Sequence, residues 1–113
     1  MAAAGLLAGK SKSKCFFLSS NLWNTTVGFG KYDKKEKEWD FEINIRELSI
    51  IEAGIGCAIW DASIILSRFI FDSLHEKIRN KRVLELGSGV GLPGIMAARY
   101  AREVYMSDFI DQV

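Results

Sequence analysis

Apolar and polar residues alternate strictly between residues 38 and 46. The apolar residues take every second position: Trp39, Phe41, Ile43 and Ile45. Because successive side chains of a strand point to opposite faces, this alternation predicts a half-buried β-strand. A charged turn at residues 32–37 precedes the strand, and β-forming residues lie before that turn. The pattern therefore predicts a β-hairpin.

A helical pattern begins after residues 50–59, which contain two glycines and are expected to form a loop. Apolar residues recur there at helical spacing: Ala62, Ile65, Leu66, Phe69 and Ile70. Ile64 and Phe71 widen this apolar face, so we expect the helix to be covered on two sides. Asp61 is the expected N-cap. His75 is expected to be a solvated residue near the helix end.

The C-terminal third predicts a strand, a helix and a second strand. The first strand is expected at Arg82–Leu86, the helix from Leu92 to about Ala101, and the second strand at Glu103–Ser107. Pro93, the only proline, suits the first helical turn because its missing N–H is not needed there. Two strands joined by a crossover helix are parallel. The fold class is therefore expected to be α/β.

Composition excludes several function classes. The chain has 113 residues, enough for one domain, and its net charge of +1 gives no argument for a nucleic-acid or membrane partner. Its apolar runs are shorter than the roughly 20 residues that span a bilayer. Cys15 and Cys57 lack partners at metal-ligand spacing, so we expect free thiols in a reducing compartment and no metal.

The most informative stretch is the glycine-rich turn between the predicted strand and helix. It contains Gly87, Gly89 and Gly91, and Asp108 ends the following strand. Glycines allow the main chain to approach a ligand closely. An acid at the end of the next strand can accept hydrogen bonds from both ribose hydroxyls. The sequence therefore predicts a nucleotide-binding crevice.

The identity of the nucleotide depends on how the glycines are read. Residues 89–94 match the dinucleotide pattern G-x-G-x-x-G, which favours an NAD(P)- or FAD-binding module. Glu85, however, is expected near the site of the pyrophosphate and would repel it. Its carboxylate suits the ammonium and sulfonium of S-adenosyl-L-methionine better. A third interpretation is that Glu85 caps a tight turn that binds no ligand.

Two motifs carry a resemblance to a known family. Glu85-Leu86-Gly87-Ser88-Gly89-Val90-Gly91 resembles the first motif of class I (seven-β-strand) methyltransferases. Together with Ile59-Trp60-Asp61-Ala62 and the apolar helix between them, it is similar to the family 16 protein-lysine methyltransferases. The resemblance covers roughly residues 41–108.

The resemblance implies a Rossmann-like methyltransferase fold that binds S-adenosyl-L-methionine. Trp60 would contact the cofactor, Gly87-Ser88-Gly89 would wrap its methionine part, and Asp108 would hold the ribose. The predicted cofactor-binding set is Trp60, Glu85, Gly87, Ser88, Gly89, Gly91 and Asp108. Without the resemblance, Trp60 would be interpreted as a core or hairpin residue. The implied partner is a protein substrate, such as a chaperone or an ATPase, in the cytoplasm or nucleus.

The expected organisation has three parts: a disordered tail at residues 1–14, a β-hairpin region at 15–58, and the first half of the cofactor domain at 59–113. In the resembled family, later strands supply an adenine-binding stretch and the acidic motif that positions the target lysine. Neither can be located here, so no catalytic residue is assigned and the fold is expected to be incomplete. A truncated, non-catalytic isoform or fragment is therefore the main alternative.

Overall fold

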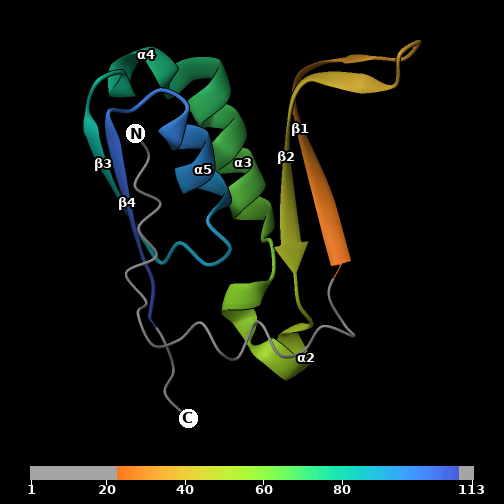
Figure 1. Cartoon of the computed structure of the whole chain (residues 1–113), viewed down its shortest axis with the longest axis vertical. Coiled ribbons are helices and arrows are strands. Elements are labelled where there is room, and N and C mark those ends of the chain that lie inside the picture. The colour runs from red at the N-terminus through yellow and green to blue at the C-terminus, as the bar shows by residue number, and fades with distance from the viewer. Residues whose placement is uncertain (1–22, 110–113) are drawn as a thin grey trace.

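The structure of the protein is a computed structural model that describes residues 23–109. Its elements follow in the order β1 (Trp23–Asp33), β2 (Glu38–Glu47), α2 (Ile50–Ala53), η2 (Ile55–Cys57), α3 (Asp61–Phe69), η3 (Ile70–Leu74), α4 (His75–Ile78), β3 (Arg82–Leu86), α5 (Leu92–Ala98) and β4 (Glu103–Ser107). Helices α3 and α5 lie between the β1–β2 hairpin and the β3–β4 pair (Figure 1). The expected tail and Cys15 fall outside the described residues.

The predicted hairpin is confirmed. β1 and β2 pair antiparallel, with an irregularity between Phe29 and Tyr32. Alternate residues of β2 are more buried, as the pattern predicted. The turn is shorter than expected, because β1 continues to Asp33 and the carboxylate of Asp33 accepts hydrogen bonds from the N–H groups of Lys35 (2.7 Å) and Glu36 (3.1 Å).

Residues 61–78 form a run of helical segments that includes the π-helical segment η3. The predicted N-cap is wrong by one residue: Trp60 is the N-cap and Asp61 is the first helical residue. The carbonyl of Trp60 accepts hydrogen bonds from the N–H groups of Ser63 (2.9 Å) and Ile64 (3.4 Å). Asp61 still lies in the first turn, where a negative charge interacts favourably with the helix dipole.

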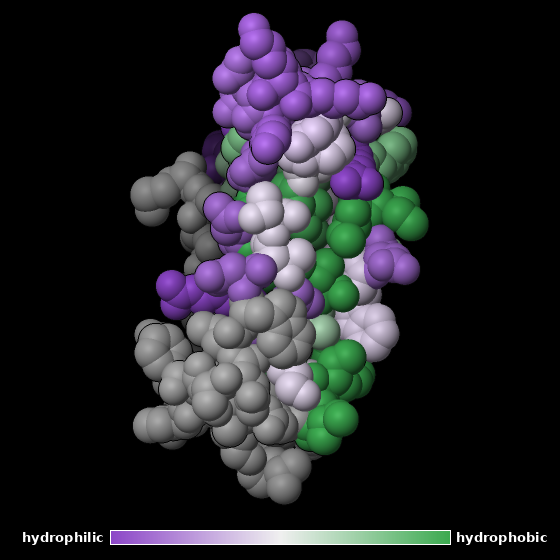
Figure 2. Space-filling view, turned by 90° about the vertical axis from the view of Figure 1, so that its right-hand side faces the viewer, coloured by the Kyte–Doolittle hydropathy of each residue, from purple (hydrophilic) through white to green (hydrophobic). Residues whose placement is uncertain are grey.

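The apolar face of α3 is only partly covered. Ile65, Leu66 and Phe69 are 69%, 44% and 51% exposed, whereas Ser67 and Ile70 are buried. Ser67 can be buried because its hydroxyl donates to the carbonyl of Ser63 (2.6 Å). The expected cover on two sides is therefore wrong for residues 23–109, which leave Ile65, Leu66 and Phe69 exposed. In Figure 2, the side of the molecule that carries the hairpin faces the viewer, and apolar surface forms a band toward the right of the view.

The predicted βαβ unit is confirmed at the bounds expected for both strands. β3 and β4 pair in parallel, from Arg82 with Glu103 to Leu86 with Ser107. α5 ends at Ala98, three residues earlier than expected, because the hydrogen bonds that follow include the i to i−3 type of a 3₁₀ turn. The N–H of Arg99 donates to the carbonyl of Met96 (3.2 Å), which is an i to i−3 hydrogen bond.

One hydrophobic core joins the hairpin, the helices and the β3–β4 pair. Its buried members are Val27, Phe29, Ile43, Ile45, Ile70, Leu92, Met96, Ala97 and Val104. Phe71 of η3 connects the layers, since its ring lies 5.8 Å from that of Phe29 and 6.4 Å from that of Phe41. Such aromatic pairs stabilise beyond their buried area.

His75 is less solvated than its charged neighbours suggested. It begins α4, its side chain is 32% exposed, and its ring lies 5.4 Å from that of Tyr100. The Nδ1 atom is buried. Packing against Tyr100, which no local pattern shows, corrects the expectation of a solvated residue.

Within residues 23–109, no helix has the length and apolar character that crossing a bilayer requires.

Candidate functional site

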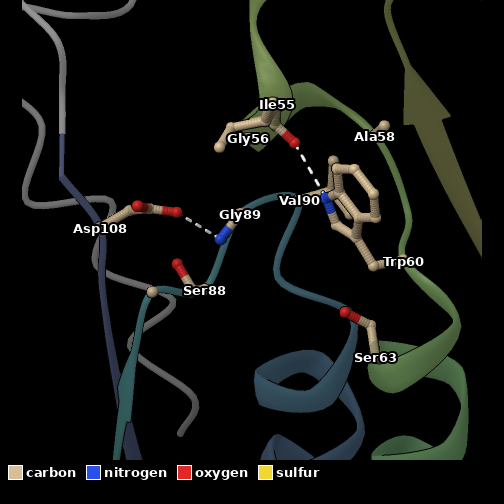
Figure 3. A pocket seen from close by; sticks show the side chains of 10 residues that line it. Ile55, Gly56, Ala58, Trp60, Ser63, Ser88, Gly89, Val90 and Asp108 are labelled. Atoms are coloured by element: carbon tan, nitrogen blue, oxygen red, sulfur yellow. Dashed lines mark hydrogen bonds between the residues drawn. The ribbon is translucent and has the colours of Figure 1, made fainter. Parts of the chain in front are cut away.

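A cavity of about 180 Å³ lies beyond the C-terminal ends of β3 and β4, where ligands bind in open α/β sheets. Its walls come from the glycine-rich turn, from the end of β4 and from the segment between η2 and α3 (Figure 3). The lining residues are Ile55, Gly56, Ala58, Trp60, Ser63, Gly87, Ser88, Gly89, Val90 and Asp108. Five of the seven predicted cofactor-binding residues are among them.

The glycine-rich turn needs its glycines for two different reasons. Gly87, Gly89 and Gly91 have φ angles of 64°, 52° and 83°, in the region that side chains disfavour. A Cβ atom at Gly89 would also lie 3.3 Å from the carbonyl oxygen of Gly56. Gly89 therefore permits both the turn and the close approach of the opposite wall.

Backbone hydrogen bonds connect the glycine-rich turn to the end of β4. The N–H of Ser88 donates to the carbonyl of Ser107 (3.0 Å), and the N–H of Gly91 donates to the carbonyl of Ser88 (2.8 Å). The Ser107 hydroxyl donates to the carbonyl of Glu85 (3.1 Å). These bonds position the turn against the residue that follows β4.

Asp108 lies at the cavity, immediately after β4. One carboxylate oxygen accepts a hydrogen bond from the N–H of Gly89, and the other accepts from the N–H of Phe109 (2.6 Å). The side chain is exposed and lies on the opposite side of Gly89 from Trp60 (Figure 3). Asp108 therefore contacts the glycine-rich turn and also presents a carboxylate to the cavity.

Trp60 forms part of the opposite wall. Its indole N–H donates to the carbonyl of Ile55 (3.0 Å), and the residue is 51% exposed (Figure 3). The structure thus places Trp60 at the cavity and not in the core. A half-exposed aromatic ring beside a polar turn offers a surface on which a planar group can stack.

Glu85 and Gly91 do not line the cavity. The carboxylate of Glu85 lies beside Gly94 in the first turn of α5, where a Cβ atom would overlap it. Burial raises the pKa of Glu85, the N–H of Gly94 opposes that change, and the negative charge of Asp108 adds to it. Gly91 is the N-cap of α5. The structure does not bring these two residues into the cavity with the other five.

Half of the lining residues were not predicted from the sequence. Ile55, Gly56, Ala58, Ser63 and Val90 also line the cavity. The pair Gly54 and Gly56 was the available signal, because closely spaced glycines permit a close approach of backbone. Nothing in the local pattern indicated that this segment would face the glycine-rich turn.

The chemistry of the lining suits binding more than bond cleavage. It offers backbone N–H groups, one carboxylate, one indole ring and two serine hydroxyls. Among residues 23–109, no group of three or more His, Cys, Asp or Glu side chains is placed to hold a metal ion. The cavity is also smaller than the roughly 300 Å³ at the lower end of ordinary ligand pockets. A cavity of this size has room for only part of a ligand as large as a nucleotide.

Comparison with known proteins is consistent with a methyltransferase. The sequence model of a family described as lysine methyltransferase matches residues 33–113. The histone-arginine methyltransferase METTL23 of Xenopus laevis is 30% identical over 76 residues, which cover 66% of this chain and 32% of that protein. EEF1A lysine methyltransferase 3 of Mus musculus is 37% identical over 67 residues, covering 55% of this chain and 28% of that protein.

A plant protein is also similar. Calmodulin-lysine N-methyltransferase of Arabidopsis thaliana is 45% identical over 76 residues, covering 66% of this chain and 24% of that protein. The chain therefore spans between 24% and 32% of the length of these three relatives.

Proposed function

The chain belongs to the lysine methyltransferase family, and from this we propose that it binds S-adenosyl-L-methionine for the methylation of a protein lysine. The observation that carries the proposal is the cavity beyond β3 and β4, with Asp108 on one side and Trp60 on the other. The relatives are named as protein methyltransferases, which supports methyl transfer to a protein as the general reaction.

The described residues fit different parts of this cofactor. Asp108 would accept hydrogen bonds from the ribose hydroxyls, because its carboxylate reaches the cavity at the end of β4. The backbone of Gly87-Ser88-Gly89 would surround the methionine part. Trp60 would pack its ring against the cofactor. Because the cavity is about 180 Å³, these residues would hold only part of the molecule.

Glu85 and Gly91 take indirect roles in this proposal. Gly91, the N-cap of α5, is in a left-handed conformation and so sets the direction in which the glycine-rich turn leaves the site. Glu85 lies beside Gly94 and contributes negative charge near the turn without contacting the bound cofactor.

S-Adenosyl-L-methionine supplies an electrophilic methyl group on a cationic sulfur. A neutral lysine amine would attack that methyl in line, the C–S bond would break, and S-adenosylhomocysteine would be the leaving group. The methylated amine would then lose a proton to solvent. We assign no catalytic base among residues 23–109. The contribution of this chain is to hold the cofactor in one geometry, and such positioning is worth as much as roughly 7–11 kcal/mol in favourable intramolecular reactions.

The acceptor is proposed from the relatives. Two of the three are named for lysine, on EEF1A and calmodulin, and one is named for arginine on histone. The family resemblance adds chaperones and ATPases as substrate classes, in the cytoplasm or nucleus. Lysine is favoured because the family that matches residues 33–113 is described by it. Mass spectrometry of methylated peptides distinguishes lysine from arginine as the acceptor.

We also propose that residues 59–113 form the first half of the cofactor domain and residues 15–58 a separate hairpin region. Residues 23–58 include the β1–β2 hairpin, and residues 59–109 include β3, α5 and β4. The hairpin nevertheless shares the core, since the Phe29 ring lies against that of Phe71.

Substitution of Asp108 tests the cofactor site. We expect S-adenosylhomocysteine to bind to the 113-residue chain and Asp108→Asn to weaken binding by about tenfold or more, since hydrogen bonds to a charged group contribute roughly 1.5–3 kcal/mol. Isothermal titration measures both affinities. Asp72→Asn, at an exposed position in η3, is the control and should bind like the wild type.

Two outcomes would contradict this proposal. If the Asp108→Asn variant binds S-adenosylhomocysteine as tightly as the wild type does, Asp108 does not make the assigned contact with the ribose. Displacement of S-adenosylhomocysteine by NADH would favour the dinucleotide interpretation of residues 89–94.

A non-catalytic role is the second candidate, and one observation favours it. The cavity is small for a complete cofactor, at about 180 Å³. A transfer assay with radiolabelled methyl donor and a peptide library tests it. Binding without transfer supports the non-catalytic role, and methylation of any peptide by this chain contradicts it.

A further inference from the structure

An acidic residue occupies a buried position at the end of β2. Glu47 is 8% exposed and continues the row of inward-facing residues to which Ile43 and Ile45 belong. Burying a carboxylate is costly unless hydrogen bonds compensate for the lost water. An apolar residue at this position would continue the core. The presence of a carboxylate here therefore needs a structural explanation.

Glu47 accepts hydrogen bonds from two different parts of the chain. One carboxylate oxygen accepts from the hydroxyl of Thr25 in β1. The other accepts from the backbone N–H of Ile59 at 2.6 Å. The side chain therefore connects the hairpin to the segment between η2 and α3.

That segment is the cavity wall that carries Trp60. Ala58 is extended, with φ −118° and ψ 153°, and Trp60 is extended with φ −102° and ψ 150°. Extended residues outside a sheet need other partners for their backbone groups. Glu47 provides the partner for Ile59, and the N–H of Leu48 donates to the carbonyl of Cys57 (3.0 Å).

We propose that Glu47 is a positioning residue for the cavity: it holds the backbone of Ile59 and thereby sets where Trp60 faces the glycine-rich turn. Its importance for cofactor binding rests on the proposed function. The inference about the position of Trp60 does not, because it follows from the hydrogen bonds. The glycine-rich turn and the end of β4 supply one side of the cavity, and Glu47 determines the location of the other.

The test measures the environment of Trp60 in the ligand-free chain. The protein is labelled with 5-fluorotryptophan, and its Trp60 fluorine resonance is assigned by its loss in Trp60→Phe. Glu47→Leu removes both acceptors at similar volume, and we expect it to shift or broaden that resonance. Glu47→Gln keeps one acceptor for the N–H of Ile59, so we expect it to restore a resonance close to that of the wild type.

Asn44→Leu is the matched control. Asn44 lies in the same strand and accepts a hydrogen bond from the hydroxyl of Thr26 (2.6 Å), but on the exposed face. This variant should leave the Trp60 resonance unchanged. If Glu47→Leu does not fold, Glu47→Asp replaces it, because the shorter side chain cannot reach both donors and should cause the same shift.

An unchanged Trp60 resonance in the folded Glu47→Leu or Glu47→Asp variant would overturn the inference, and so would an equal shift in Asn44→Leu. Affinity for S-adenosylhomocysteine is measured in parallel. A misplacement of about 1 Å can cost about 100-fold in a positioned site, so we expect at least a tenfold loss in Glu47→Leu. A shifted resonance in a protein whose wild type binds no S-adenosylhomocysteine would contradict the proposed function and leave the inference on Glu47 intact.

Discussion

At the residue scale, Glu85 differs most from its expected role. Its place before the glycines suggested a carboxylate facing a bound cation, but its side chain lies beside Gly94 and Met106, away from the cavity. Side-chain direction in a strand decides this. Val83 and Glu85 are half-buried, whereas Leu84 and Leu86 are exposed, so Glu85 faces the helices.

The raised pKa of Glu85 predicts a pH-dependent cost in stability. Between the ordinary glutamate pKa of about 4.3 and its higher value in the fold, the folded chain binds more protons than the unfolded chain. Stability therefore falls as pH rises through that interval. We expect Glu85→Gln to raise the melting temperature at pH 7 and to have little effect at pH 4.

Thermal melts at both pH values check this prediction, with Glu76→Gln as the control. The pKa of Glu76 is lowered by its hydrogen bond with Arg79, so loss of its charge should not raise the melting temperature at pH 7. The gain for Glu85→Gln should be a few degrees, as about 1 kcal/mol corresponds to roughly 4–8 °C in a small domain. An equal gain at both pH values would contradict burial of the charge as its cause.

At the element scale, the hairpin owes its close packing to a glycine. A Cβ atom at Gly28 would overlap the ring of Trp39. Arg68 of α3 lies 5.9 Å from the centre of that ring, and its guanidinium donates to the carbonyl of Gly28 at 3.4 Å. Gly28 is therefore the position where β1, β2 and α3 meet.

Substitution of Gly28 tests this packing. We expect Gly28→Ala to lower the free energy of unfolding by about 1–3 kcal/mol, the usual cost of overpacking. Gly56→Ala is the matched control, because a Cβ atom there meets nothing within 4 Å. Urea unfolding followed by circular dichroism measures both variants, and equal losses would contradict the steric explanation.

At the scale of the whole molecule, one face of the β3–β4 pair is left open by residues 23–109. Leu84, Leu86 and Tyr105 are 64%, 76% and 42% exposed there, and a hollow of about 480 Å³ lies over this face. Parallel sheets in stable proteins are covered on both faces. Apolar surface of this kind promotes association.

We therefore expect the chain to associate at increasing concentration, and Leu86→Glu to reduce this association. Sedimentation velocity over a range of concentrations measures it. Thr26→Glu places the same charge on the exposed face of the hairpin and should leave the association unchanged. A wild-type chain that stays monomeric at all concentrations would contradict this prediction.

The sequence by itself determined the local elements. Strict alternation at residues 38–46 and apolar runs at residues 82–86 and 103–107 predicted strands at or close to their observed bounds, because side-chain periodicity follows directly from backbone geometry. The positive φ angles at Gly87, Gly89 and Gly91 were likewise encoded locally. The family followed from the same motifs.

Only the tertiary structure decided which residues meet. The approach of Gly56 to Gly89, the packing of His75 on Tyr100 and the hydrogen bond from Ile59 to Glu47 join residues that no periodicity relates. The alternation that predicted β2 also placed Glu47 on its inward face, but the donors that satisfy its carboxylate come from other segments. Contacts of this kind depend on how the layers pack, and packing is a property of the whole chain.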